Sequence, residues 1–256
     1  MKIVHDPTHQ QINFLDERFY TADNKTYFPS VTTILDVYPK GQGFHNWLKS
    51  FGIQSEEIVK KAAQQGTNVH NAIDRYLNGE RLAWSDNEQS NYTLEEWLMI
   101  LKFEEFWNVT TPKVLANEIS LVSEELEMGG TIDLVCAIKN PLGKEELWLI
   151  DHKTSNSIHT SHELQLAAYA TMWNLLNPKY PIDRTGILHL KAATRGFDSR
   201  GEKIQGKGWQ LKEFDRHYSE SYKVFQHVHA IWKEEHPTYK PKNKIYPDSI
   251  QRKEEK

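Results

Sequence analysis

The stretch LWLIDHKTS, residues 147–155, decides the fold, because four apolar residues lead directly into Asp151, His152 and Lys153. A short apolar run bounded by polar residues is typical of a buried β-strand. Side chains alternate between the two faces of a sheet, so Asp151 and Lys153 share one face and His152 lies on the other. A carboxylate beside an ammonium at the end of a buried strand suits a site that binds a divalent cation together with a phosphate.

Two earlier strands each carry one carboxylate among apolar residues. Asp133 interrupts GGTIDLV, residues 129–135, and Glu118 interrupts VLANEI, residues 114–119. A charge at such a position is costly to bury unless it is paired or binds a metal. Carboxylate oxygens are hard ligands, which favour Mg²⁺ or Mn²⁺. We therefore expect these carboxylates and the strand lysine to meet at one edge of the sheet.

Other interpretations of the carboxylates remain open. Each one alone is equally consistent with a strand-end charge that faces water or with an ordinary ion pair. Glu118 also competes with three glutamates nearer Asp133 in the sequence, but these occur in a polar run typical of a hairpin surface: Glu124, Glu125 and Glu127. The order in which single carboxylates follow successive strands favours a shared site.

The rest of the chain alternates strands with helices. Apolar spacing predicts helices over 56–76, 93–107, 161–176 and 218–232, and β-rich runs predict strands over 114–122, 130–138, 146–153, 187–191 and 209–211. The first forty residues predict a small meander of strands and then a short helix that Ser30 caps. The fold class is α/β (α+β): a central mixed β-sheet flanked by helices, with an N-terminal β/helical extension.

Two of these helices carry distinctive residues. Gly66 lies inside the first, where glycine costs about 1 kcal/mol relative to alanine, so we expect something to approach it closely. In the second helix, an apolar stripe is predicted, with the glutamates between its members on a solvated face. The stripe consists of Leu94, Trp97, Leu98, Leu101 and Phe106.

Composition narrows the classes of protein. The chain has 256 residues, 38% of them hydrophobic and 26% charged, which is typical of a globular domain. Cys136 is the only cysteine, so the chain can form neither an internal disulfide nor a four-cysteine iron–sulfur cluster. No stretch reaches the roughly 18 to 20 apolar residues of a membrane helix, and the first ten residues contain no apolar signal core. We expect a cytoplasmic protein without a membrane partner.

Charge is unevenly distributed along the chain. The formal net charge is −4, which by itself argues against a phosphate-rich partner. Residues 1–190 hold 16 Lys and Arg against 25 Asp and Glu, a net of −9, whereas residues 191–216 hold 7 against 4, a net of +3. The acidic front includes the expected metal ligands, and the basic rear is suited to follow a phosphate backbone.

The order of these residues resembles the PD-(D/E)XK nuclease superfamily, and in particular its RecB-type branch. The matching segments are Glu118, GTID at 130–133, DHK at 151–153 and QLAAY at 165–169, preceded by PSVT at 29–32 and GTNVH at 66–70. The chain is similar to compact phage or bacterial RecB-like exonucleases and to the mitochondrial genome maintenance exonuclease. The resemblance implies a restriction-endonuclease-like core.

The resemblance also implies which residues bind metal. The expected ligands of one or two Mg²⁺ or Mn²⁺ ions are His70, Glu118, Asp133 and Asp151. Lys153 would act on the nucleophilic water or on the scissile phosphate. His70 taken alone is better explained as a satisfied helix histidine. Several relatives carry a four-cysteine iron–sulfur cluster, and with a single cysteine we expect none here.

A further group of residues is assigned to nucleic-acid binding. By resemblance, Gln165 and Tyr169 would contact nucleic acid and brace the site, and their i, i+4 spacing puts them on one helix face. Thr154 and Ser155 either donate hydrogen bonds to phosphate or simply end the strand. A basic loop with a nearby indole fits single-strand binding, although a solvated hairpin explains each of its residues at least as well. The candidates are Ser30, Thr154, Ser155, Gln165, Tyr169, Lys191, Arg195 and Trp209.

Three hypotheses about function follow. The first is a metal-dependent DNA exonuclease that hydrolyses phosphodiester bonds of single-stranded DNA or DNA ends in replication, recombination or repair. The second is a RecB-like endonuclease in defence or DNA processing, and the third is a non-catalytic nucleic-acid-binding module on a nuclease scaffold. Without a helicase or ATP-binding signature, the chain would act alone or with a separate helicase, recombinase or single-strand-binding protein. We expect residues 1–54 to pack on a nuclease core at 55–236, followed by a Lys/Pro/Glu-rich tail at 237–256.

Overall fold

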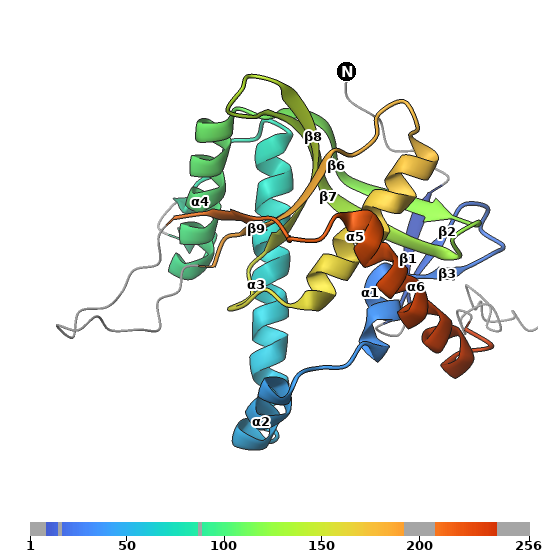
Figure 1. Cartoon of the computed structure of the whole chain (residues 1–256). Coiled ribbons are helices and arrows are strands. Elements are labelled where there is room, and N and C mark those ends of the chain that lie inside the picture. Colours follow the sequence, from blue (N-terminus) through green and yellow to red (C-terminus); the bar gives the residue numbers. More distant parts are fainter. Residues whose placement is uncertain (1–8, 15–16, 87–88, 192–207, 240–256) are drawn as a thin grey trace, which may run out of the picture.

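The computed structural model describes residues 9–14, 17–86, 89–191 and 208–239, which are shown in Figure 1. The helices are α1 (Val31–Ile34), α2 (Gln42–Phe51), α3 (Gln54–Leu77), α4 (Leu94–Thr110), α5 (Thr160–Leu176) and α6 (Tyr218–Glu235). The strands are β1 (Gln10–Phe14), β2 (Glu17–Thr21), β3 (Phe28–Pro29), β4 (Ser85–Asp86), β5 (Gln89–Ser90), β6 (Lys113–Ser123), β7 (Met128–Lys139), β8 (Glu145–Lys153), β9 (Arg184–His189) and β10 (Gln210–Lys212).

A five-stranded mixed sheet forms the centre of the protein, with the strand order β10-β9-β8-β7-β6. β6, β7 and β8 are antiparallel neighbours, whereas β8 and β9 are parallel. Parallel neighbours need a long crossover connection, which α5 supplies. The mixed sheet and its flanking helices confirm the predicted fold class.

Helices cover both faces of the sheet, as Figure 1 shows. On one face, Leu149 of β8 packs in a buried cluster with residues of α1, α5 and α6. On the other face, Ile150 packs in a second cluster with residues of α3 and α4. Consecutive residues of β8 therefore enter opposite layers, as strand alternation requires. No helix within the described ranges is both long and apolar enough to cross a membrane.

The N-terminal strands form a separate small sheet, β1-β2-β3, that packs on β6 and β7. A Cβ atom at Gly129 would lie 2.2 Å from Cβ of Tyr20, so only glycine lets β2 approach this closely. Ser30 forms an isolated bridge with Gly129, and its Oγ accepts a hydrogen bond from the Thr33 amide at 2.9 Å. The predicted helix cap at Ser30 is confirmed.

The apolar stripe predicted for α4 is correct for Phe106, which is buried, and for Trp97, which packs against the buried cluster, but not for its three leucines. Leu94, Leu98 and Leu101 are 57%, 45% and 39% exposed, whereas Ile100 and Phe103 are buried. Apolar residues occur on every side of this helix, so apolar spacing alone could not identify the side that packs on α3 and the sheet.

The start of α4 explains why one of its glutamates is not solvated. The Thr93 hydroxyl accepts a hydrogen bond from the Glu96 amide, and the Glu96 carboxylate accepts one from the Thr93 amide at 2.7 Å. This capping box buries Glu96 at the first turn of the helix.

Candidate active site

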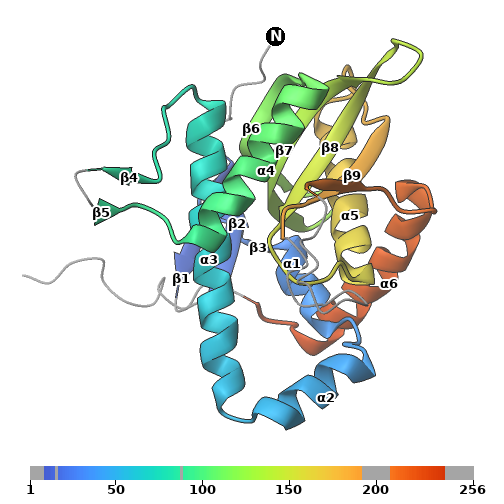
Figure 2. The ribbon, with the colours of Figure 1, turned by 90° about the vertical axis from the view of Figure 1, so that its left-hand side faces the viewer.

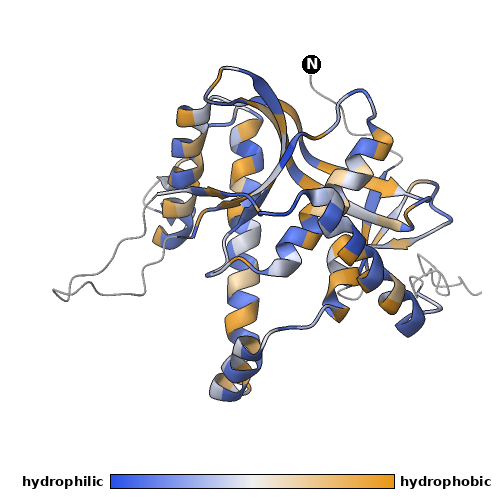
Figure 3. Cartoon of the chain, in the orientation of Figure 1, coloured by the Kyte–Doolittle hydropathy of each residue, from blue (hydrophilic) through white to orange (hydrophobic). Residues whose placement is uncertain are grey.

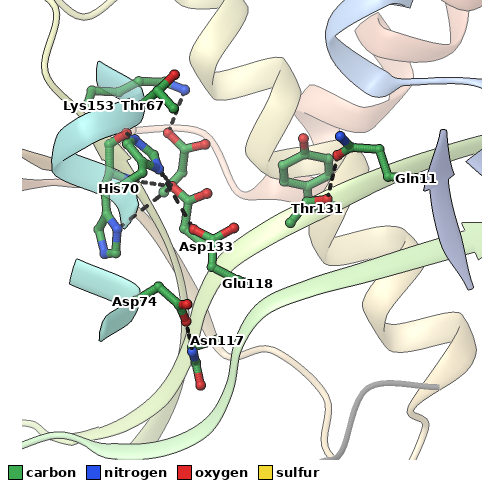
Figure 4. A network of polar contacts seen from close by, with 12 residues as sticks. Gln11, Thr67, His70, Asp74, Asn117, Glu118, Thr131, Asp133 and Lys153 are labelled. Carbon is green, nitrogen blue, oxygen red and sulfur yellow. Dashed lines mark hydrogen bonds and ion pairs between the residues drawn. The ribbon is translucent and has the colours of Figure 1, made fainter. Parts of the chain in front are cut away.

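Side chains from three strands and one helix meet at one point of the central sheet, as Figure 4 shows. Lys153 Nζ lies 2.8 Å from Asp151 Oδ2 on β8. His70 of α3 places Nδ1 3.6 Å from Asp133 Oδ2 on β7 and 3.9 Å from Glu118 Oε1 on β6. The residues expected to bind metal and to act in catalysis therefore lie in one region of the sheet, as two neighbouring groups.

The strands are irregular where two of the carboxylates leave them. In β7, Ile132 and Val135 pack in the same buried cluster although they are three positions apart, so the side-chain alternation shifts at Asp133. On the neighbouring strand, Glu118 has a φ angle of 45°, in the left-handed region. Such a conformation is unfavourable for a glutamate and is characteristic of functional sites. Both distortions turn carboxylates toward the same point.

His70 presents one ring nitrogen to these carboxylates. Its Nε2 lies 3.0 Å from the main-chain carbonyl oxygen of His152 and donates a hydrogen bond to it, so Nδ1 faces Asp133 and Glu118. Burial lowers the pKa of His70, but Asp133 and Glu118 outweigh this effect and raise the pKa to about 9. A positive charge is thus strongly favoured between the carboxylates.

The electrostatics around Lys153 keep it protonated. Burial lowers the pKa of the Lys153 ammonium, but Asp151 and Asp133 outweigh burial and raise the pKa above its usual value. Its Nζ also donates a hydrogen bond to Gln165 Oε1 at 3.2 Å. Lys153 is therefore a fixed cation at neutral pH rather than a proton acceptor.

Two residues of α5 brace the end of β8. Gln165 Nε2 lies 3.0 Å from Asp151 Oδ1 and 3.3 Å from the Tyr169 hydroxyl. Tyr169 is buried against the sheet, and a Cβ atom at Gly130 would lie 2.3 Å from its Cε1 atom. The two glycines of GGTID therefore each make room for one aromatic ring: Gly129 for Tyr20 of β2, and Gly130 for Tyr169 of α5.

The residues present fit a divalent cation. Three carboxylates and an imidazole supply the oxygen and nitrogen donors that Mg²⁺ and Mn²⁺ accept. Asp151 Oδ2 is buried and, apart from its ion pair with Lys153, has no hydrogen-bond partner among the described residues. The three carboxylates carry three negative charges, and protonated Lys153 and His70 carry two positive charges. The site therefore has a net charge of −1, which attracts a cation.

His152 belongs to the site in a way that sequence reasoning missed. Its amide donates a hydrogen bond to Asp133 Oδ2 at 2.7 Å, and its ring Nδ1 lies 3.9 Å from the same oxygen. Burial lowers the pKa of His152 to about 3, so the ring is neutral. Together with His70 and Asp133, it offers ligand atoms that all lie within 4.8 Å of one another. The alternation correctly placed its side chain on the other face, but gave no sign of these contacts.

A second missed contact ties α3 to β6. Asn117 Nδ2 donates a hydrogen bond to Asp74 Oδ1 at 2.6 Å, immediately beside Glu118. Asp74 follows His70 by one helical turn, so both side chains lie on the same side of α3. That i, i+4 spacing is the signal from which Asp74 could have been found.

Two of the predicted nucleic-acid contacts lie beside the site. Thr154 Oγ1 would be 3.2 Å from a Cβ atom at Gly66, so Thr154 is the close neighbour that the glycine admits. The Ser155 hydroxyl donates a hydrogen bond to the Ser157 carbonyl at 2.9 Å. Both residues follow Lys153 directly, at the end of β8.

The other predicted contacts are engaged elsewhere or lie beyond the description. Ser30 is buried as the cap of α1, and Trp209 packs edge-to-face on Phe106 with ring centroids 5.2 Å apart. Lys191 forms an ion pair with Glu95 and donates a hydrogen bond to Gln65 at 3.1 Å. Arg195 lies outside the described residues, as does the tail from residue 240.

The mixed sheet between helices, with carboxylates and a lysine on adjacent strands, is consistent with a restriction-endonuclease-like nuclease fold. A family model of the PD-(D/E)XK nuclease superfamily matches residues 19–239, and the chain belongs to this superfamily. By the order of its segments, the name-giving signature corresponds to Asp133 and to Asp151-His152-Lys153, with Ile132 where that signature has proline. A comparison with curated proteins found no match.

Proposed function

We propose that this protein is a Mg²⁺- or Mn²⁺-dependent DNA exonuclease of the RecB-type branch that degrades single-stranded DNA or DNA ends in replication, recombination or repair. The observation that carries the proposal is the convergence of three strand carboxylates, a helix histidine and a protonated lysine at one point. Membership of a nuclease superfamily supports nuclease chemistry in general. The preference for ends rests on the resemblance to RecB-like exonucleases.

In the proposed site, His70, Glu118, Asp133 and Asp151 hold one or two divalent ions. Such an ion, when bound, lowers the pKa of a coordinated water and stabilises negative charge on the phosphate. The residues of the chain supply the positioning. The amide of His152 fixes Asp133, whose Oδ2 it contacts at 2.7 Å.

Lys153 stabilises charge in this proposal. Its ammonium is held between Asp151 Oδ2 at 2.8 Å and Gln165 Oε1 at 3.2 Å. Because its pKa is raised, it carries the positive charge that the additional negative charge of an attacked phosphate requires. Gln165 and Tyr169 keep Asp151 and Lys153 in place, and any contact of these two residues with DNA remains a prediction.

A digestion series tests the proposal. Purified protein is incubated with end-labelled linear DNA, single-stranded and duplex, and with a covalently closed single-stranded circle, each with Mg²⁺, Mn²⁺ or EDTA. We expect linear substrates to shorten from their ends with either metal, the circle to stay intact, and EDTA to stop the reaction.

Variants separate the possible outcomes. Asp151→Asn and Lys153→Ala should lower the rate by at least a hundredfold, whereas Asp86→Asn on exposed β4 should leave it unchanged. Cleavage of the circle would favour an endonuclease. A wild type inactive on every substrate and with every metal, together with no heat of Mn²⁺ binding in calorimetry, would leave only the non-catalytic binding module.

A further inference from the structure

The helical arm formed by α2 and the first half of α3 projects from the body of the protein, as Figures 1 and 2 show. Between Gly41 and Asn68, only Ser55 is buried. Figure 3 shows apolar residues, in orange, on the projecting part of α3. Exposed apolar side chains grouped in this way mark an interaction surface rather than a core.

Three aromatic rings lie in a row along α2. Phe44, Trp47 and Phe51 follow the i, i+3, i+7 spacing of one helix face. The centroids of Phe44 and Trp47 are 6.0 Å apart with planes inclined by 27°, and those of Trp47 and Phe51 are 5.7 Å apart with planes inclined by 40°. Phe44 and Phe51 are 39% and 44% exposed. Trp47 between them is half-buried. Partly exposed rings in such a row are the platforms on which single-stranded bases stack.

The charge of the arm differs in sign from that of its surroundings. Residues 42–65, from the start of α2 to the middle of α3, carry three lysines, Lys49, Lys60 and Lys61, against two glutamates, a net of +1. The rest of residues 1–190 has 13 basic against 23 acidic residues, a net of −10. Just before α2, Lys40 Nζ lies 5.3 Å from the centre of the Phe44 ring and 3.8 Å from Asp36 Oδ1. Lysines can contact the phosphates of a single-stranded nucleic acid while the neighbouring rings stack on its bases. An apolar protein surface would offer these lysines no partner.

The arm is continuous with the candidate active site. α3 runs without interruption from Gln54 to Leu77, so it carries the arm at one end and His70 at the other. Lys61 precedes His70 by nine residues, which is about 14 Å along a helix. Gln65, between the two, contacts Lys191 at 3.1 Å. A strand leaving the metal site along α3 would therefore pass Gln65, the ion pair of Lys191 with Glu95, and then Lys61 before it reached the rings.

We propose that this arm is a second binding site for single-stranded DNA, where Phe44, Trp47 and Phe51 stack on bases of the strand outside the metal site and the lysines contact its phosphates. This inference rests on the proposed function. In this proposal, the rings bind the part of a long substrate strand that extends beyond the metal site.

The test compares long and short strands. The Asp151→Asn protein binds dye-labelled oligothymidylates of 20 and 4 nucleotides, followed by fluorescence anisotropy, with and without Trp47→Leu and Phe44→Leu. Leucine keeps the apolar face and the helix but removes the stacking ring. We expect the Kd of the 20-mer to rise about tenfold per ring and that of the 4-mer to stay the same.

Controls decide between this proposal and its competitors. Trp84→Leu removes another indole that is 44% exposed, and it should leave both Kd values unchanged. Light scattering of wild type and Trp47→Leu reports assembly. A wild-type dimer that Trp47→Leu converts to monomer would overturn the proposal in favour of contact between copies of the chain.

Two failures can be told apart. If the wild type degrades DNA but the ring variants bind the 20-mer as tightly as their parent, the arm is not a strand-binding site and the proposed function stands. If the wild type degrades no DNA and binds neither oligonucleotide, both the proposed function and the arm site are wrong.

Discussion

Glu118 shows at the level of one residue how the site distorts the fold. Its φ of 45° is a left-handed conformation inside a β-strand, which costs an L-residue with a side chain roughly 1–2 kcal/mol. Its carboxylate is also costly, because burial raises its pKa, although the neighbouring His70 partly offsets that effect. Strained residues of this kind cluster at functional sites, where the strained backbone directs a side chain into the site.

Glycine should therefore be the best-tolerated residue at this position. We expect Glu118→Gly to be more stable than Glu118→Ala by about 1 kcal/mol, because glycine adopts positive φ without strain. Urea denaturation followed by circular dichroism measures the difference. At Ser120, which has an ordinary negative φ, the order should reverse, with alanine more stable than glycine. An equal or lower stability for Glu118→Gly would show that the left-handed backbone is not strained.

His229 of α6 should make the protein sensitive to mild acid. It is 8% exposed, its Nε2 has no hydrogen-bond partner among the described residues, and burial followed by the charge of Lys233 lowers its pKa to about 4. In the unfolded chain this histidine takes up a proton near pH 6.5, whereas in the folded protein it does so only near pH 4. The contribution of neutral His229 to the free energy of unfolding is therefore fully present above pH 6.5 and is lost as the pH falls from 6.5 to about 4.

Replacing that histidine removes part of the acid sensitivity. We expect His229→Gln to lose less stability than the wild type between pH 7 and pH 5, by on the order of 1 kcal/mol. Melting temperatures measured across this range report the effect. His45→Gln, on the exposed side of α2, serves as the matched control and should follow the wild-type profile.

Among the elements, β7 and α5 depend on each other through Gly130 and Tyr169. Gly130→Ala should destabilise the protein by about 1–3 kcal/mol, because the new Cβ would lie 2.3 Å from the Tyr169 ring. Adding Tyr169→Leu should recover part of that loss, so the two changes will not be additive in urea denaturation. Gly43→Ala in α2 meets no atom within 4 Å and should not destabilise. Additivity of the pair would mean that the ring is not what requires glycine.

Elements in which apolar residues recur with one clear spacing could be predicted from the sequence. Elements whose position depends on contacts with other elements could not. β8 was predicted over 146–153 and spans Glu145–Lys153, because its apolar run ends in charges that reach the site. The helix α2 went unpredicted although Phe44, Trp47 and Phe51 recur at helical spacing, because Gly41 and Gly43 at its start are typical of a loop. The same limit applies to the site: strand carboxylates stood out among apolar residues, whereas His152 acts through contacts between elements.

For the molecule as a whole, the site concentrates like charges that folding must hold together. A divalent ion that binds only the folded protein stabilises it in proportion to its excess over Kd. We expect Mn²⁺ at a hundredfold excess over its Kd to raise the melting temperature by about 5–10 °C relative to EDTA. Differential scanning fluorimetry measures the shift without any need for activity.

The rise in melting temperature with Mn²⁺ should depend on the carboxylate side chains of the candidate site. It should disappear in Asp133→Asn and persist in Asp86→Asn, whose carboxylate lies on the exposed strand β4. A shift of equal size in all three proteins would mean that the ion binds outside the carboxylate cluster.

The turn between β7 and β8 divides the residues of the candidate site between two stretches of chain. Leu142 at its tip is 92% exposed, and Gly143 adopts a φ of 79°. His70, Glu118 and Asp133 precede this turn, whereas Asp151 and Lys153 follow it. A chain opened there would yield two fragments, neither with a complete site, whose complementary strands β7 and β8 could recombine. The fold therefore offers a natural position for a split enzyme, active only when its halves are brought together.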